Sequence, residues 1–276
     1  MGLSKVAVVK GERSHEPVFE ALDLVDFKEA ISGWSTVLIK VNFITTKTWD
    51  TGATTDPIVV EGIIKKLQDT PVKVYVVESD ATMTNADKAF EMTGMRQMCM
   101  QNGIECINLR HEKERVKITV PDGEALRSVK VPRIVAESAI ISAAKLKTHR
   151  STIVTLGMKN MFGLLPDKFK SKYHFKDISK VIVDINSVLR PVLTVIDGFV
   201  GMEGRGPVGG LPVQMNLTIA GNDVVATDSV GCRVMGIDPH KIRHIQRAHE
   251  KGLGNIDEIE LLGERLEKVI RVFKQP

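Results

Sequence analysis

Residues 36–79 read TVLIKVNFITTKTWDTGATTDPIVVEGIIKKLQDTPVKVYVVES. The runs 36–42 and 73–79 are rich in β-branched residues, which is typical of buried strands. Between them, the segment 56–69 carries apolar residues at helical spacing and begins with Asp56 and Pro57, a capping side chain followed by proline in the first turn. This strand–helix–strand unit predicts two parallel strands joined by a right-handed crossover.

The same alternation extends in both directions along the chain. Further strands are expected at 5–10, 104–109, 139–145, 192–197, 215–220 and 258–262, and helices at 16–31, 84–102, 177–189, 223–235 and 239–251. Strands that alternate with helices are typical of a sheet covered on both faces. The pattern therefore predicts a three-layer α/β fold with a mostly parallel sheet.

One segment departs from this alternation. Residues 116–120 and 128–131 have strand character and flank the turn sequence Pro121-Asp122-Gly123, which predicts an inserted β-hairpin. No proline- or serine-rich linker divides the sequence into two halves. We therefore expect residues 1–276 to form a single α/β domain.

The amino-acid composition excludes several classes of protein. With 276 residues, 43% of them hydrophobic and 26% charged, the chain has a globular balance that excludes disorder. Aromatic residues make up only 5%, which argues against a stacking platform for single-stranded nucleic acid. The three cysteines form no C-x-x-C motif, so the chain lacks ligands for an iron–sulfur cluster of its own and fits a reducing compartment. No apolar run reaches the ~18 residues of a membrane span, so we expect a cytoplasmic protein without a membrane partner.

Positive charge is concentrated in one part of the sequence. Residues 145–180 contain nine basic and two acidic side chains, a net charge of +7, whereas the whole chain carries +4. A local excess of this kind attracts an anion, although a solvated lysine face would have the same composition. The small total charge argues against a nucleic-acid partner.

Several basic residues of this segment are candidate site residues. Lys147 and His149 directly follow an apolar strand, and ligands of open α/β sheets bind outside the carboxyl ends of strands. Lys159 lies within the apolar stretch 152–165, where a lysine is rarely tolerated without a partner or a task. We predict that Lys159 acts in the site and that His149 or His174 transfers protons. Asn160 and Lys168 complete the ligand-binding residues expected in this segment.

Other candidates come from the ends of the first strands. Lys40 and Asn42 end one predicted strand, and Glu78 ends the next. The carboxyl ends of neighbouring parallel strands meet at one edge of a sheet. We therefore expect these three residues near Lys147 and Asp197.

Three carboxylates are candidate metal ligands. Asp197 ends a predicted strand, and Glu203 follows it on a glycine-rich turn, an arrangement that suits a divalent metal or acid–base chemistry. Asp228 lies inside a helical pattern and faces either solvent or the cleft. Alternatively, Asp197 caps the turn and Glu203 is solvated.

Several motifs, taken in order, resemble one known family. These are IKVN at 39–42, KLKTH at 145–149, TLGMKNMFG at 155–163, VIDG at 195–198, MEGRGP at 202–207 and DVVATD at 223–228. Together they are similar to the core of the domain-of-unknown-function 362 family, over residues 5 to 255. Val41 stands where that family usually has proline.

The resemblance implies a prokaryotic α/β domain without a settled activity. Many members carry a ferredoxin-like segment with cysteine clusters and are regarded as iron–sulfur proteins. This chain has no cysteine after residue 255. An iron–sulfur role would therefore need a partner protein.

The sequence leads to one main functional hypothesis and one alternative. The main hypothesis is a Lys/His/Asp-lined cleft that binds an anionic small molecule, with or without a divalent metal, at the carboxyl ends of the strands. The alternative is a non-catalytic redox or cofactor-assembly component that works beside an iron–sulfur partner. Binding alone and binding followed by a reaction are both compatible with these residues.

Overall fold

The computed structural model describes residues 3–167 and 169–276. Its strands are β1 (Ser4–Lys10), β2 (Thr36–Lys40), β3 (Lys73–Glu78), β4 (Glu105–Asn108), β5 (Arg115–Thr119), β6 (Ser128–Pro132), β7 (Ala139–His149), β8 (Ile153–Val154), β9 (Leu193–Glu203), β10 (Leu211–Gly221) and β11 (Ile259–Gly263). Its helices are α1 (Glu16–Leu24), α2 (Phe27–Ala30), α3 (Pro57–Leu67), α4 (Ala86–Met92), α5 (Met95–Gln101), α6 (Arg133–Ala136), α7 (Leu156–Met161), α8 (Ile178–Val188), α9 (Val224–Val234) and α10 (Arg243–Glu250). Short 3-10 helices are η1 (Trp49–Thr51), η2 (Phe162–Leu164), η3 (Lys170–Lys176), η4 (Pro239–Lys241) and η5 (Leu266–Lys268).

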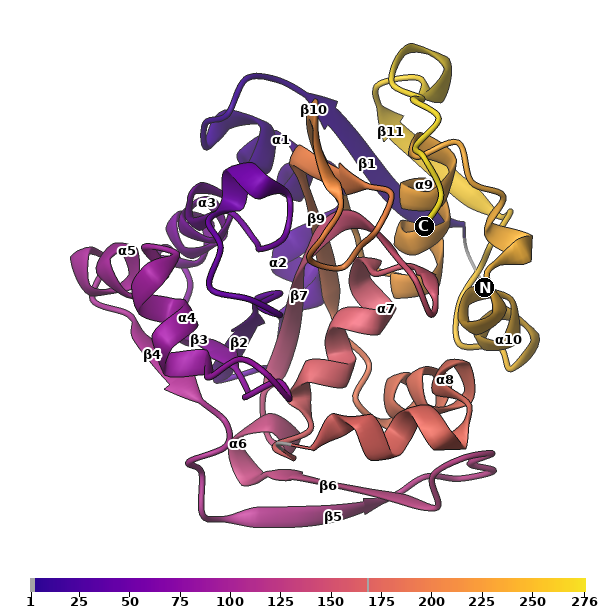
Figure 1. Ribbon diagram of the computed structural model, residues 1–276. Helices are drawn as coiled ribbons and strands as arrows, with labels where there is room; N and C mark the ends of the chain where they lie inside the picture. The colour runs from indigo at the N-terminus through magenta and orange to yellow at the C-terminus, as the bar shows by residue number, and fades with distance from the viewer. Residues whose placement is uncertain (1–2, 168) are drawn as a thin grey trace.

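One sheet joins the two ends of the sequence. Its strand order is β11-β1-β10-β9-β7-β2-β3-β4, with β8 paired to β7 (Figure 1). Strand β10 runs antiparallel to both β1 and β9, whereas the other neighbours along this order are parallel. Strands β5 and β6 form a separate antiparallel pair. The predicted mostly parallel sheet and inserted hairpin are both confirmed.

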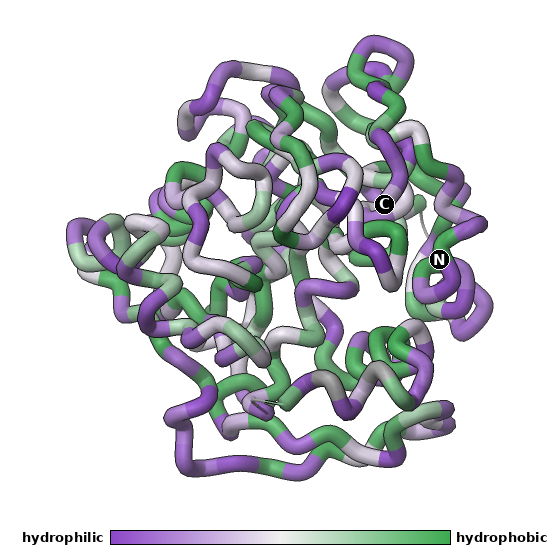
Figure 2. The backbone as a smooth tube through the Cα atoms, viewed as in Figure 1, coloured by the Kyte–Doolittle hydropathy of each residue, from purple (hydrophilic) through white to green (hydrophobic). Residues whose placement is uncertain are grey.

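Each face of the sheet packs against its own hydrophobic core. In β2, Val37 and Ile39 belong to one core, and Leu38 belongs to the other, as the two-residue period of a strand requires. Helices α1, α3 and α5 cover the first core, and α7 to α10 cover the second (Figure 1). The central strands are accordingly hydrophobic along most of their length (Figure 2). The three-layer prediction is confirmed.

Two strands continue beyond their predicted ends, which changes the surroundings of four candidate residues. Strand β7 extends through His149, so Lys147 and His149 belong to the strand rather than to a following loop. Strand β9 extends through Glu203, which places Asp197 in the middle of a strand. The glycines that suggested a turn instead allow close packing: a Cβ at Gly201 would lie 2.8 Å from the backbone oxygen of Leu146.

Candidate functional site

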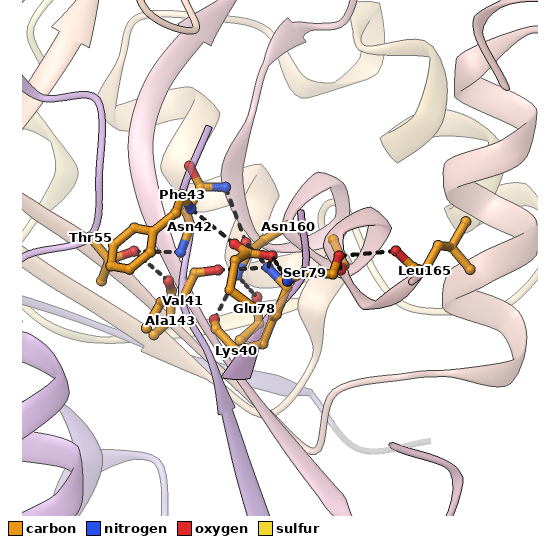
Figure 3. Close-up of polar contacts among 12 residues, drawn as sticks. Lys40, Val41, Asn42, Phe43, Thr55, Glu78, Ser79, Ala143, Asn160 and Leu165 are labelled. Atoms are coloured by element: carbon orange, nitrogen blue, oxygen red, sulfur yellow. Dashed lines mark hydrogen bonds and ion pairs between the residues drawn. The ribbon is translucent and has the colours of Figure 1, made fainter. Parts of the chain in front are cut away.

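A cavity of about 340 Å³ opens at the carboxyl ends of β2, β3 and β7. Helix α7 and the following η2 form a further wall, and Lys170 reaches the cavity from η3. The structure brings seven of the residues singled out from the sequence into its lining: Lys40, Asn42, Glu78, Lys147, His149, Lys159 and Asn160. The ends of parallel strands and a short helix thus line one cavity. Figure 3 shows the polar contacts of Lys40, Glu78 and Asn160 in its wall.

A buried ion pair lies at the ends of β2 and β3. Lys40 Nζ is 2.8 Å from Glu78 Oε1, and both side chains are almost fully buried. Lys40 Nζ also donates to the backbone oxygen of Val41 at 2.6 Å. Glu78 accepts from the backbone N–H groups of Phe43 and Ser79, each at 2.9 Å. Burial lowers the pKa of Lys40, and the charge of Glu78 partly offsets that shift.

Asn160 connects α7 to the strand ends. Its Oδ1 accepts from Lys40 Nζ at 3.2 Å and from Asn42 Nδ2 at 3.0 Å. Its Nδ2 donates to the backbone oxygen of Lys40 at 2.9 Å and to Ser142 Oγ at 3.1 Å (Figure 3). With its amide groups used in this way, Asn160 fixes the wall of the cavity.

Lys147 carries a buried amino group without an acidic partner. Its side chain is 1% exposed, and Nζ donates to the backbone oxygen of Ala53 at 2.6 Å. No carboxylate in the described part of the chain forms an ion pair with it. Burial, reinforced by the positive charges of Lys145 and Lys159, lowers the pKa of Lys147 well below its ordinary value.

Two further lysines complete the positive lining. Lys159 Nζ lies 5.3 Å from the centre of the Phe162 ring. Lys170 Nζ donates to Ser79 Oγ at 2.7 Å and to the backbone oxygen of Gly163 at 3.4 Å. Burial lowers the pKa of each lysine to about 8. Lys170 belongs to the basic segment 145–180 and Ser79 to the predicted strand 73–79, but neither was predicted to be a binding residue.

The two candidate histidines differ in what the structure describes. His149 lines the cavity, and the backbone N–H of Ser151 donates to its Nδ1 at 3.1 Å. The neutral ring therefore carries its proton on Nε2. The side chain of His174 lies outside the described part of the structure, as does the whole of Lys168.

The structure does not bring the three candidate metal ligands together. Asp197 is fully buried and lies 2.7 Å from Lys145 Nζ. Glu203 accepts from the backbone N–H of Lys274 at 3.0 Å. Asp228 binds the backbone of α7. Within residues 3–167 and 169–276, no group of three or more His, Cys, Asp or Glu side chains is arranged to hold a metal ion.

Asp228 binds the first turn of α7, the helix that forms one wall of the cavity. The two oxygens of its carboxyl group accept from the backbone N–H groups of Gly157 at 2.7 Å and Met158 at 2.8 Å, in the first turn of α7. These N–H groups have no partner within the helix. The helix that carries Lys159 and Asn160 is therefore held by a side chain of α9, seventy residues further along the chain.

The cysteines do not fit an iron–sulfur cluster. Cys99 is buried on α5, Cys106 is partly buried on β4, and Cys232 is buried on α9. A cluster bound by one chain needs about four convergent ligands. No such group exists among the described residues.

The family model described as "Domain of unknown function (DUF362)" matches residues 37–233, and the chain belongs to that family. These residues contain every strand end and helix that forms the cavity.

A curated relative is the thylakoid-associated protein sll1697 of Synechocystis sp. (strain ATCC 27184 / PCC 6803 / Kazusa). It is 26% identical over 224 residues, which cover 79% of this chain and 68% of the relative. In the described part of this chain, no helix is both long and apolar enough to span a membrane.

The close packing of Gly163 leads to a first prediction. A Cβ there would overlap Lys40 Nζ and would lie 2.7 Å from Glu78 Oε1. We expect Gly163→Ala to displace the ion pair and to lower the free energy of unfolding by about 1–3 kcal/mol. Urea denaturation measures the change. Gly209→Ala is the control, since its Cβ would meet only the backbone oxygen of Arg205 at 3.4 Å, and an equal loss in both variants would contradict the prediction.

Proposed function

We propose that the cavity binds a small anion, a phosphate or a carboxylate, through its lysines. The observation that carries this proposal is the charge of the lining: four lysines and a single carboxylate among the described residues. Burying ammonium groups costs several kcal/mol each unless a counter-charge compensates. Glu78 compensates Lys40, which leaves Lys147, Lys159 and Lys170 to act on a ligand.

The walls of the cavity fit a small organic anion. Phe43, Ile44, Phe162 and Val208 supply apolar surface, and Asn42, Thr155 and Asn160 supply polar groups. Apolar walls with a few convergent polar groups are typical of small-molecule sites. A divalent metal is not part of this proposal, because the candidate metal ligands Asp197 and Asp228 bind other protein groups.

The affinity for sulfate and its pH dependence test the proposal. Sulfate keeps its charge between pH 7 and 9, whereas Lys159 and Lys170, with pKa values of about 8, lose their protons in this range. We expect sulfate to bind more weakly at pH 9, by about tenfold for each lysine that must be protonated. Isothermal titration calorimetry at constant ionic strength measures this change. An affinity that does not depend on pH, or the absence of binding at pH 7, would contradict the proposal.

Proton uptake gives a second expected result. A bound anion favours the charged form of a neighbouring amine and thus raises the pKa of Lys147 and Lys159. Sulfate binding at pH 8 is therefore expected to take up protons. Calorimetry in two buffers of different ionisation enthalpy detects the uptake as a difference in apparent binding enthalpy. Equal enthalpies after correction for ligand dilution would show that no lysine changes its protonation.

The cellular location of this protein and its iron–sulfur partner remain predictions. We expect a cytoplasmic protein. In the alternative role, this chain is a non-catalytic redox or cofactor-assembly component, and a second protein carries the iron–sulfur cluster. The relative's name places that protein with thylakoids, so fractionation of the native cells would compare the two locations. Iron that copurifies with the chain in a stoichiometric complex would support the alternative.

A further inference from the structure

Lys159 differs from the other lysines of the cavity in its contacts. Lys40, Lys147 and Lys170 each donate hydrogen bonds to protein oxygens. Among the described residues, Lys159 Nζ has no hydrogen bond or ion pair, and it lies over the ring of Phe162, 5.3 Å from the ring centre. Its side chain is also less buried than that of Lys147. No acceptor among the described residues therefore holds the Lys159 amino group in place, and its side chain lines the cavity.

The surroundings of Lys159 raise the share of its neutral amine above that of an exposed lysine. Burial is the main cause of its pKa of about 8, and the charge of Lys40 adds to the shift. An amine with this pKa has on the order of 100-fold more of its neutral form near pH 7.5 than an exposed lysine. Desolvation and a neighbouring cation are the two effects that activate lysine as a nucleophile.

We propose that Lys159 is a nucleophile that forms an imine with a small oxo acid held in the cavity. This inference rests on the proposed anion site, because the ligand's carboxylate would bind Lys147 and Lys170. It adds a substrate class, a carbonyl compound that also carries an anionic group. The carboxylate holds the ligand, and the carbonyl carbon faces Lys159.

The covalent step balances without an oxidant or a reductant. The lone pair of Lys159 Nζ attacks the carbonyl carbon, a C–N bond forms, and the carbonyl electron pair moves to oxygen. A proton passes from nitrogen to oxygen to give a carbinolamine. The second amine proton then passes to this hydroxyl group, the C–O bond breaks, water leaves, and the nitrogen lone pair forms the C=N bond. His149, which carries its proton on Nε2 when neutral, lines the same cavity and is the candidate hydrogen-bond donor to that oxygen, without a change in its own protonation.

Reductive trapping tests this inference. The full chain is incubated at pH 7.5 with glyoxylate and cyanoborohydride, which converts an imine to a stable secondary amine, and the modified lysines are mapped by peptide mass spectrometry. We expect Lys159 to be modified at least ~10-fold faster than Lys241, whose side chain is 80% exposed. Sulfate should slow the labelling of Lys159, because it occupies the same anion site. Acetaldehyde, which lacks the carboxylate, should label it more slowly than glyoxylate.

The outcomes separate this inference from the proposed function. Sulfate binding without preferential labelling of Lys159 would overturn the nucleophile and leave the anion site intact. Labelling of Lys147 in its place, or equal labelling of all lysines, would also overturn it. Failure of sulfate to bind would instead contradict the proposed function. Lys159→Arg should abolish the adduct in the cavity, whereas Lys241→Arg should not. If Lys159→Arg fails to fold, the labelling pattern of the unsubstituted protein tests the inference by itself.

Discussion

Lys147→Met is expected to abolish sulfate binding and to raise the free energy of unfolding by about 1–3 kcal/mol. The side chain is 1% exposed and has no acidic partner in the described chain, so the folded protein bears the cost of burying an amine that prefers water. Methionine fills a similar volume without that cost. A residue that weakens the fold while it supports binding is the expected signature of a functional site. Chemical denaturation and calorimetry measure the two effects.

Lys145→Met is the matched control. Lys145 lies two residues away on β7 and is also fully buried, but it forms an ion pair with Asp197 at 2.7 Å. Its removal leaves an uncompensated buried carboxylate, which typically costs about 3–5 kcal/mol. The two substitutions should therefore change the stability in opposite directions. If both destabilise the protein equally, Lys147 is an ordinary structural lysine.

Asp228→Ala is expected to lower the free energy of unfolding by about 2–4 kcal/mol and to weaken sulfate binding. The substitution leaves the N–H groups of Gly157 and Met158 buried without acceptors. It also frees the start of the helix that carries Lys159 and Asn160. Denaturation followed by circular dichroism measures the loss. Asp228→Asn keeps one acceptor oxygen and should therefore lose less of the free energy of unfolding. An alanine variant as stable as the native protein would contradict this role of Asp228.

Asp228 also gives a pH dependence with a defined sign. Burial raises its pKa to about 8, although two backbone N–H groups lower it in part. Between about pH 4 and pH 8 the folded protein therefore binds this proton more strongly than the unfolded chain does. Through this group, stability falls as the pH rises across that window. Asp228→Asn should remove this part of the slope.

The strand pattern allowed the main part of the cavity to be predicted. Lys40 and Glu78 end two adjacent parallel strands, and parallel pairing brings such residues together whatever their separation in sequence. The apolar surroundings of Lys159 likewise identified a position on a buried helix. These predictions depended on periodicity and strand direction, which are local properties of the sequence.

The remaining features depend on contacts that periodicity does not encode. Asp197 was expected at a strand end because glycines follow it, but those glycines let β9 pack closely and continue to Glu203. Asp228 was considered as a metal ligand, and its contact with α7 joins positions seventy residues apart. Lys170 lies in the irregular segment η3, where no repeating pattern shows which lysine of a basic run faces inward.

Diffraction from crystals soaked in selenate tests the central claim most directly. Selenate resembles sulfate, and its selenium can be located by anomalous scattering. The account predicts an anomalous peak inside the cavity, within hydrogen-bonding distance of the Lys147 and Lys159 ammonium groups, that disappears in Lys147→Met. A cavity without a peak, at selenate concentrations that occupy exposed lysines elsewhere on the surface, would contradict it.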